Sequence, residues 1–252
     1  MRVLTFNLRF ANPQDGPNQW EYRKELVVDT ILACAPDIVG TQEGTVPQLE
    51  YLTEHLPGYL PLVGHRQVDP TLQYPTIFYR QGLEVRESHE FWLSKTPEVH
   101  RSLSWDSAFP RMVTYGLFRE AGRDLWFYII NTHLDHVSAL ARYHGARMIR
   151  EFFQGRPEPQ ILVGDFNEPP DAPVYQELTG PGRSFRDSWR ALYPEGPDPP
   201  TQHDFQGRAR GSRIDWILFT PPFQVMEVAI VEYNHQGRYP SDHFPYLAVF
   251  GY

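Results

Sequence analysis

Short apolar runs recur from one end of the chain to the other, separated by polar residues, glycine and proline. Several runs are apolar at every position, which is typical of strands that are buried on both faces. The strands predicted in this way span residues 3–6, 38–41, 76–79, 91–93, 112–118, 125–130, 161–163, 214–219, 225–231 and 246–250.

Two segments carry apolar residues at helical spacing. The first begins with a capping-box-like pair, Asn18 and Glu21. The second begins at Ser138 and stops at Gly155. A third helix is predicted over residues 47–55. The expected apolar faces comprise Leu26, Val27, Thr30, Ile31 and Cys34 in the first helix and Ala141, Gly145, Met148, Ile149 and Phe152 in the second.

Strands therefore dominate, with a few helices between them. This pattern predicts an α/β (α+β) fold with two sheets packed face to face and helices on the outer sides. Proline clusters at residues 156–159, 169–173 and 194–200 are interpreted as loops, because strand-like runs continue after each. We expect residues 1–252 to form a single domain.

Composition excludes several classes of protein. Formal net charge is -8 over 252 residues, which argues against broad electrostatic capture of duplex nucleic acid. One cysteine, Cys34, excludes an internal disulfide. No run approaches the roughly 20 apolar residues of a membrane helix. The first residues resemble a strand more than a signal peptide, so we expect a cytoplasmic protein unless a leader was removed.

The run that ends at Asp165 is the most informative. Residues 161–163 are apolar, Gly164 starts a turn, and Asp165 and Asn167 follow as alternate residues that share one face. A carboxylate and an amide on one rim suit the holding and activation of a water molecule beside a metal or a phosphate. The alternative is a turn in which both side chains bond only to their own backbone.

Other strands also end, or begin, in polar and chemically capable residues. No P-loop, zinc ribbon or serine-nucleophile elbow is present. Carboxylate, amide and imidazole groups suit hard, oxygen-liganded cations and water attack on phosphorus. These residues are Asn7, Gln42, Glu43, Asn131, His133, Asp135, His136, Asp165, Asn167, Arg213, Asp215, Ser241, Asp242 and His243.

With Gln42-Glu43, Gly164-Asp165-Phe166-Asn167 and Ser241-Asp242-His243 in this order, the chain resembles the endonuclease/exonuclease/phosphatase superfamily, which includes exonuclease III and deoxyribonuclease I. The resemblance extends from Asn7 to His243. At Asn7-Leu-Arg9 and Asn131-Thr-His-Leu134, the chain is more similar to the deadenylase-like branch than to the DNA-repair branch. It implies a four-layered α/β/β/α sandwich and a divalent-metal-dependent phosphoester hydrolase.

The resemblance also implies roles. Glu43, Asn7 and Asp242 would be metal residues, for Mg²⁺ or alternatively Mn²⁺. Asp165 would activate water and Asn167 would hold it. Asp215 would orient His243 and favour its protonated form. Asn131 and His133 would contact the phosphate. The expected substrate-binding residues are Arg9, Arg111, Arg142 and His203, with Arg208, Arg210 and Arg213 as a local basic loop.

The predicted substrate is single-stranded nucleic acid or a small phosphodiester. The alternatives are a phosphomonoesterase for sugar, inositol or nucleotide phosphates and a non-catalytic scaffold. A zinc site like that of metallo-β-lactamases fits His133, Asp135 and His136 poorly, because Asn131 replaces the first histidine and no cysteine compensates. No exposed amphipathic helix indicates a membrane anchor. Oligomeric state is not predicted.

Overall fold

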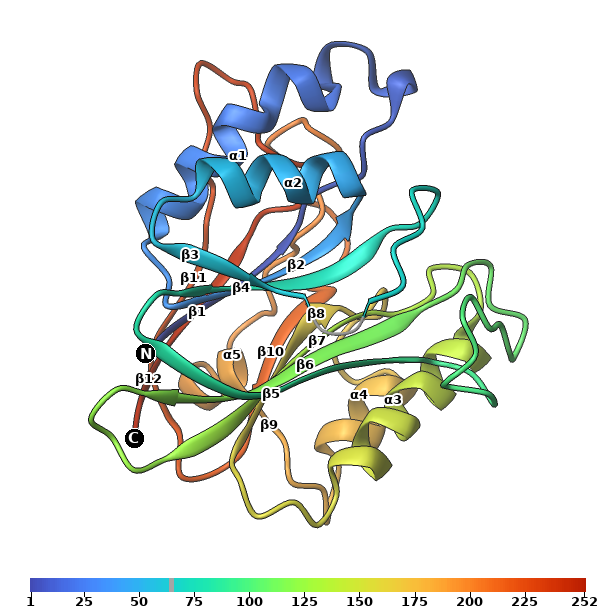
Figure 1. Cartoon of the computed structure of the whole chain (residues 1–252), viewed down its shortest axis with the longest axis vertical. Coiled ribbons are helices and arrows are strands. Elements are labelled where there is room, and N and C mark those ends of the chain that lie inside the picture. The colour runs from blue at the N-terminus through green and yellow to red at the C-terminus, as the bar shows by residue number, and fades with distance from the viewer. Residues whose placement is uncertain (64–65) are drawn as a thin grey trace.

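Two mixed β-sheets pack face to face, and helices cover their outer sides (Figure 1). This computed structural model describes residues 1–63 and 66–252. Helices α1 and α2 lie over one sheet, and α3 and α4 lie over the other. The predicted four-layered α/β/β/α arrangement is confirmed.

Each sheet has six strands. In spatial order, the first sheet contains β11 (Gln224–Ile230), β12 (Tyr246–Gly251), β1 (Arg2–Asn7), β2 (Ile38–Gly44), β4 (Tyr74–Arg80) and β3 (Tyr59–Leu62). The second contains β5 (Leu83–Trp92), β6 (Met112–Glu120), β7 (Trp126–His133), β8 (Gln160–Asp165), β10 (Asp215–Phe219) and β9 (Arg186–Asp187). The helices are η1 (Pro13–Asn18), α1 (Trp20–Cys34), α2 (Val46–His55), α3 (Ala139–Phe153), α4 (Pro173–Thr179) and α5 (Ser188–Leu192).

The central strands are buried on both faces because their alternate side chains enter different layers. In β8, Ile161 and Val163 lie in the core between the sheets, whereas Leu162 packs in the layer under α3. Full burial of such a side chain stabilises the fold by about 1.5–3 kcal/mol. This double burial explains the continuously apolar runs in the sequence.

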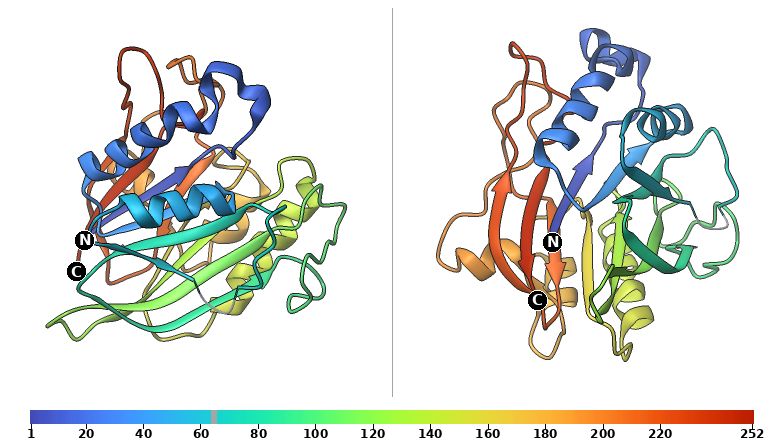
Figure 2. Two further views of the ribbon diagram at one scale, coloured as in Figure 1. Left: turned by 45° about the horizontal axis from the view of Figure 1, so that its top comes forward. Right: turned by 60° about the vertical axis from the view of Figure 1, so that its left-hand side comes forward.

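Two strand pairs are parallel, one in each sheet. Strands β1 and β2 are parallel in the first sheet, as are β7 and β8 in the second. Their carboxyl ends meet at one end of the sandwich, while β10 runs antiparallel to β8 and begins there. The two chain termini lie together at another edge, where the Met1 amino group donates to the Phe250 carbonyl oxygen (Figure 2).

The predicted helix starts were partly wrong. Helix α1 begins at Trp20 after Gln19, which makes no side-chain cap, and Asn18 belongs to η1 instead of a capping box. A capping box does occur at α2, where Thr45 and Gln48 bond reciprocally. The predicted start of α3 is confirmed, since the Ser138 hydroxyl accepts from the Ala141 N–H.

The predicted buried faces of α1 and α3 are correct at most positions. Phe153, not Phe152, completes the buried face of α3, and Phe152 is 40% exposed. Leu26 and Met148 are only partly buried. The remaining predicted core positions of α1 and α3 are buried as expected.

Strands β3 and β9 were not predicted, and only the end of β5 was. Strand β5 lies at an edge of its sheet and alternates exposed and partly buried residues, so its polar sequence gave no apolar run. Strand β9 is too short for a pattern. No helix within residues 1–63 or 66–252 has the length and apolar character needed to cross a membrane.

Candidate active site

The site lies at the edge where the parallel strands end. Asp165 ends β8, and its registered neighbours are His133 at the end of β7 and Asp215 at the start of β10. Gly164 allows this close pairing, because a Cβ atom there would lie 2.2 Å from the Thr132 carbonyl oxygen. Sheet register therefore brings three chemically capable side chains from distant parts of the sequence to one point.

Asn7 connects the two sheets at this point. Its Nδ2 donates to Glu43 Oε1 at 3.1 Å and to Asp165 Oδ2 at 2.9 Å. Its Oδ1 accepts from the Arg9 N–H at 2.9 Å, and Glu43 Oε2 accepts from the Phe10 N–H at 3.0 Å. Glu43 and Asp165, which belong to different sheets, are thus held at fixed positions.

Asp215 and His243 form a buried pair. His243 Nδ1 lies 2.9 Å from Asp215 Oδ2. Burial opposes charge on His243, but the carboxylates of Asp215, Asp165 and Asp242 outweigh it and raise the pKa of His243 well above its usual range. The surrounding carboxylates therefore favour the protonated form of His243, whose Nδ1 is directed at Asp215.

Asp165 has the opposite character. Burial, together with the nearby charge of Asp215, raises the pKa of Asp165 above that of an ordinary aspartate. Its Oδ1 accepts from the Asn167 N–H at 2.9 Å, so the carboxylate is anchored at both oxygens. A fixed carboxylate with a raised pKa suits proton acceptance from water near neutral pH.

His133 is neutral. Burial and the positive charge of Arg111 lower the pKa of His133 well below its usual range. Arg111 Nη1 lies 3.0 Å from His133 Nδ1, and Asn167 Nδ2 lies 3.0 Å from His133 Nε2. His133 Nε2 also lies 3.6 Å from Asp165 Oδ2.

The donor set fits a hard divalent cation. Glu43, His133 and Asp165 offer ligand atoms within 4.8 Å of one another, and Asp165, Asp215 and His243 form a second such group. Asp215 Oδ1 is buried, and no residue in the described part of the chain donates to it. Clustered carboxylate oxygens with an unsatisfied buried acceptor match the oxygen-rich coordination of Mg²⁺ or Mn²⁺.

Asp242 lies beside this cluster and faces Arg9. Its Oδ2 is 3.7 Å from Arg9 Nη1, and its Oδ1 accepts from the Ser241 hydroxyl at 3.2 Å. Ser241 Oγ also lies 2.6 Å from the Asn7 carbonyl oxygen. Asp242 belongs to neither group of close ligand atoms.

Asn131 is not at the site. It is fully buried between the sheets, and its Nδ2 donates to the carbonyl oxygens of Thr41 and Thr76 at 2.9 and 3.0 Å. Its Oδ1 accepts from Gln42 Nε2 at 2.8 Å. Both amide hydrogens are used, so the predicted contact between Asn131 and phosphate is wrong, and the residue instead joins the two sheets.

Three of the predicted substrate-binding residues are occupied by protein contacts. Arg9 forms two hydrogen bonds with Asp15, at 2.8 and 3.0 Å. Arg142 Nε donates to Glu168 Oε1 at 2.9 Å.

His203 stacks on Phe244 with ring centroids 4.0 Å apart, and burial lowers its pKa to about 4. Among these predicted substrate-binding residues only Arg111 lines the cavity beside Glu43 and His133.

The predicted basic loop is also weaker than expected. Arg213 is buried and pairs with Asp187 and Asp198, whereas Arg208 and Arg210 are exposed. No local pattern indicates this pairing, because Asp198 and Asp187 lie 15 and 26 residues from Arg213 in the chain. The same holds for Arg23, a functional residue not predicted from sequence, which is 2% exposed and donates to backbone carbonyls of the loop after β1.

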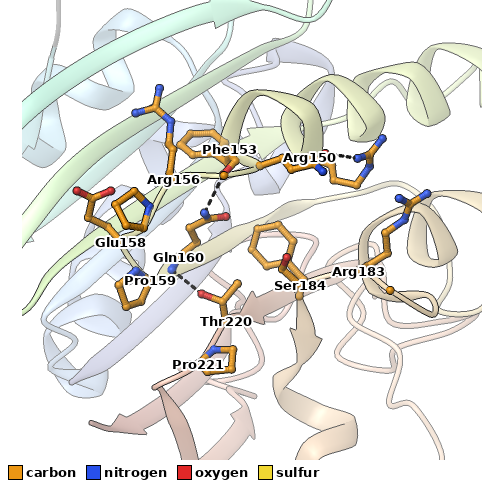
Figure 3. A pocket seen from close by; sticks show the side chains of 15 residues that line it. Arg150, Phe153, Arg156, Glu158, Pro159, Gln160, Arg183, Ser184, Thr220 and Pro221 are labelled. Carbon is orange, nitrogen blue, oxygen red and sulfur yellow. Dashed lines mark hydrogen bonds between the residues drawn. The ribbon is translucent and has the colours of Figure 1, made fainter.

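A cavity of about 230 Å³ lies at the amino-terminal end of β8, opposite the end that carries Asp165 (Figure 3). Gln160 there bonds to the Phe153 carbonyl and to Thr220, and Arg150 is paired with Glu177. None of the predicted site residues lines it. The acids and histidines therefore place the candidate active site at the carboxyl ends of the parallel strands, which is where α/β sheets commonly bind their ligands.

The sequence profile of the Endonuclease/Exonuclease/phosphatase family matches residues 4–243. The chain belongs to this family. Members of the Endonuclease/Exonuclease/phosphatase family are phosphoester hydrolases, in agreement with the cluster of acids and histidines described above.

Solved structures agree with this assignment. A family protein from Bacteroides thetaiotaomicron (target BtR318A) is 31% identical, with a TM-score of 0.90 over 99% of this chain and 97% of that chain. The mannosyl-6-phosphatase Bt3783 of Bacteroides thetaiotaomicron VPI-5482 is 30% identical, with a TM-score of 0.88 over 100% of both chains. The human nocturnin catalytic domain shares the fold at 21% identity and a TM-score of 0.74, over 100% of this chain and 93% of that one.

A curated relative, protein L388 of Acanthamoeba polyphaga mimivirus, is 30% identical over 155 residues. The match covers 54% of this chain and 54% of the relative, so the chain spans about half the length of the curated relative it matches.

Proposed function

We propose that this chain is a divalent-metal-dependent phosphomonoesterase that hydrolyses a small phosphorylated sugar or polyol by in-line attack of water. The observation that carries the reaction is the convergence of Glu43, His133, Asp165, Asp215 and His243 within the two groups of close ligand atoms. The small substrate is supported by the cavity beside this cluster and by the name of one full-length relative at 30% identity.

Asp165 accepts the proton of the attacking water. Its carboxylate is fixed by the Asn7 amide and the Asn167 N–H, so little reorganisation accompanies the reaction. Its raised pKa makes it a stronger base than an exposed aspartate. Asn167, whose side chain also contacts His133 and the Leu134 carbonyl, holds the position of this segment.

His243 and His133 stabilise the negative charge that develops on the phosphoryl oxygens. His243 is charged and held through Nδ1 by Asp215, so its Nε2–H is the group available to an oxygen. His133 is held between Arg111 at Nδ1 and Asn167 at Nε2, and its Nε2 lies 3.6 Å from Asp165 Oδ2, so its ring faces the same reacting centre. Preorganised donors of this kind are each worth about 10²–10³ in rate.

Glu43 and Asn7 would hold the metal ion, with Asp165 and the unsatisfied Oδ1 of Asp215 close by. When bound, Mg²⁺ or Mn²⁺ supplies positive charge that neutralises the phosphoryl oxygens and orients the substrate. The Asn7 amide donates to Glu43 and Asp165, and this bridge keeps the two carboxylates in position for that ion.

The small substrate is preferred to a nucleic acid strand because few cations remain free around the site. Arg9 and Arg142 are neutralised by Asp15 and Glu168, and Arg213 is buried. Binding of a polyanionic strand uses several phosphate contacts to unpaired Lys or Arg. The sequence alone favoured single-stranded nucleic acid or a phosphodiester, and these remain the comparison substrates.

The test is hydrolysis by the full chain with Mg²⁺ or Mn²⁺, and with EDTA as control. The panel contains hexose 6-phosphates, glycerol phosphate, a nucleoside 5′-monophosphate, bis-p-nitrophenyl phosphate and a single-stranded oligoribonucleotide. We expect metal-dependent release of phosphate from the hexose phosphates. Cleavage of only the oligonucleotide or the diester would replace the phosphomonoesterase with a nuclease, and inactivity on every substrate would favour the scaffold.

A further inference from the structure

A small cavity adjoins the catalytic cluster and is walled by two loops. Its volume is about 70 Å³, well below the roughly 300–1,000 Å³ of drug-sized ligand pockets. Glu43, Arg111, His133 and Phe109 are among the residues that line it. Phe109 is 55% exposed, so a large apolar ring is half exposed to solvent beside the catalytic cluster.

The loop that carries Phe109 is held rigidly. Asp135 is 1% exposed, and its Oδ2 accepts from Ser107 Oγ at 3.1 Å, Ala108 N at 3.0 Å and Phe109 N at 3.3 Å. Its Oδ1 accepts from the first residues of the α3 segment, including Ser138 N at 2.7 Å. One carboxylate therefore fixes the backbone on both sides of the exposed ring.

The ring itself has defined neighbours. Phe109 stacks on His136 with ring centroids 5.6 Å apart and planes at 26°. The Arg111 guanidinium carbon lies 5.8 Å from the Phe109 centroid, and Arg111 Nη2 lies 3.2 Å from His136 Nδ1. Arg111 thus connects the exposed ring to His133 at the catalytic centre.

Two other residues that line the cavity, Thr71 and Gln73, are polar. The Thr71 hydroxyl already donates to Asp69 Oδ1 at 2.7 Å and accepts from Arg101 Nη1 at 3.0 Å. Among residues 1–63 and 66–252, the Gln73 side chain makes no hydrogen bond. The Gln73 amide is therefore the polar group that a ligand hydroxyl can bond beside the Phe109 ring.

We propose that Phe109 is a specificity-determining residue that stacks on the leaving group of the substrate, a sugar or polyol, and that Gln73 bonds its hydroxyl groups. This proposal rests on the proposed phosphomonoesterase function and adds a subsite to it. A rigid, half-exposed aromatic ring binds a ligand at little entropic cost.

The experiment compares the full chain with Phe109→Ala, Phe109→Tyr and the matched control Tyr22→Ala. Tyr22 is 57% exposed on α1, away from the cavity. Measured quantities are KM and kcat for hexose 6-phosphate and for a nucleoside 5′-monophosphate, and the inhibition constant of inorganic phosphate, which cannot reach Phe109 and the catalytic centre together.

We expect Phe109→Ala to raise KM for hexose 6-phosphate about 10-fold, as loss of one aromatic contact predicts. The inhibition constant of inorganic phosphate should stay unchanged, Phe109→Tyr should restore KM, and Tyr22→Ala should match the native chain. Gln73→Ala should raise KM for the same sugar phosphate without altering phosphate inhibition.

Other outcomes overturn the proposal in distinguishable ways. If the native chain hydrolyses hexose phosphate and Phe109→Ala leaves KM unchanged, the subsite is wrong while the proposed function stands. A parallel loss of phosphate inhibition would show general disruption of the site and would also reject the subsite. Preference for the nucleotide would reject the sugar, and inactivity of the native chain on all monoesters would reject the proposed function together with the subsite.

Discussion

Arg23 Nη1 donates to the Pro240 carbonyl oxygen at 2.9 Å, which joins α1 to the segment just before Ser241, Asp242 and His243. The same guanidinium donates to the carbonyl oxygens of Leu8 and Arg9, in the loop that follows Asn7. One buried cation therefore positions the loops on which both the metal side and the histidine side of the site depend.

Arg23→Lys should lower the free energy of unfolding by about 2–4 kcal/mol, since an ammonium group cannot reach carbonyls that a planar guanidinium spans. Denaturant unfolding monitored by circular dichroism measures this change. Arg147→Lys is the control, because Arg147 is half exposed and, in the part of the chain that the structure describes, pairs only with Glu151. Equal stability of the two variants would show that the Arg23 contacts contribute little.

Asp165→Asn and His243→Ala should each reduce kcat by at least about 10²-fold, because each removes a group that touches the reacting atoms in the proposed mechanism. Their circular dichroism spectra should match that of the native chain. Asp29→Asn, an exposed substitution on α1, serves as control. Near-native turnover by either active-site variant would exclude the role assigned to that residue.

Removal of divalent metal with EDTA should abolish hydrolysis, and Mg²⁺ or Mn²⁺ should restore it. Glu43→Gln should raise the metal concentration for half-maximal activity at least about 10-fold, because a hard cation loses one charged oxygen. The native Tm should also increase with metal concentration, as ligand linkage requires. An unchanged metal requirement in Glu43→Gln would place the ion on other residues.

Asp135 should contribute acid-sensitive stability. Burial alone would raise its pKa, but the N–H groups of Ser138 and Val137 and the charge of Arg111 outweigh it and hold the pKa of Asp135 below its usual value. The unfolded chain therefore binds the proton first as pH falls, so this stabilisation is present above pH 4 and is lost as pH falls below it.

The matching measurement is the unfolding free energy of the native chain and of Asp135→Asn between pH 3 and 7. We expect Asp135→Asn to have an unfolding free energy about 2 kcal/mol lower than that of the native chain at pH 7, because charge-assisted hydrogen bonds are lost. This difference between the two proteins should become smaller toward pH 3. Glu54→Gln, at an exposed site on α2, is the control. A difference that is independent of pH would contradict the charged state of Asp135.

Local pattern was enough to predict much of the fold. The central strands have continuously apolar sequences because both of their faces are covered. These apolar runs made the strands recognisable in the sequence. Strand β5 was mostly missed because its outer position leaves alternate residues exposed. Phe152 and Phe153 are adjacent, so helical spacing alone did not decide which one the second sheet buries.

Side-chain alternation and turn residues are local properties of the chain, so its amino-acid pattern was enough to place Asp165, His133 and Glu43 at strand ends and His243 just before the last strand. Which of the polar groups remain free depends on tertiary contacts. Asn131 lies two residues before His133 on the same strand, yet its amide is consumed between the sheets. Such partners come from distant segments, and no local pattern records them.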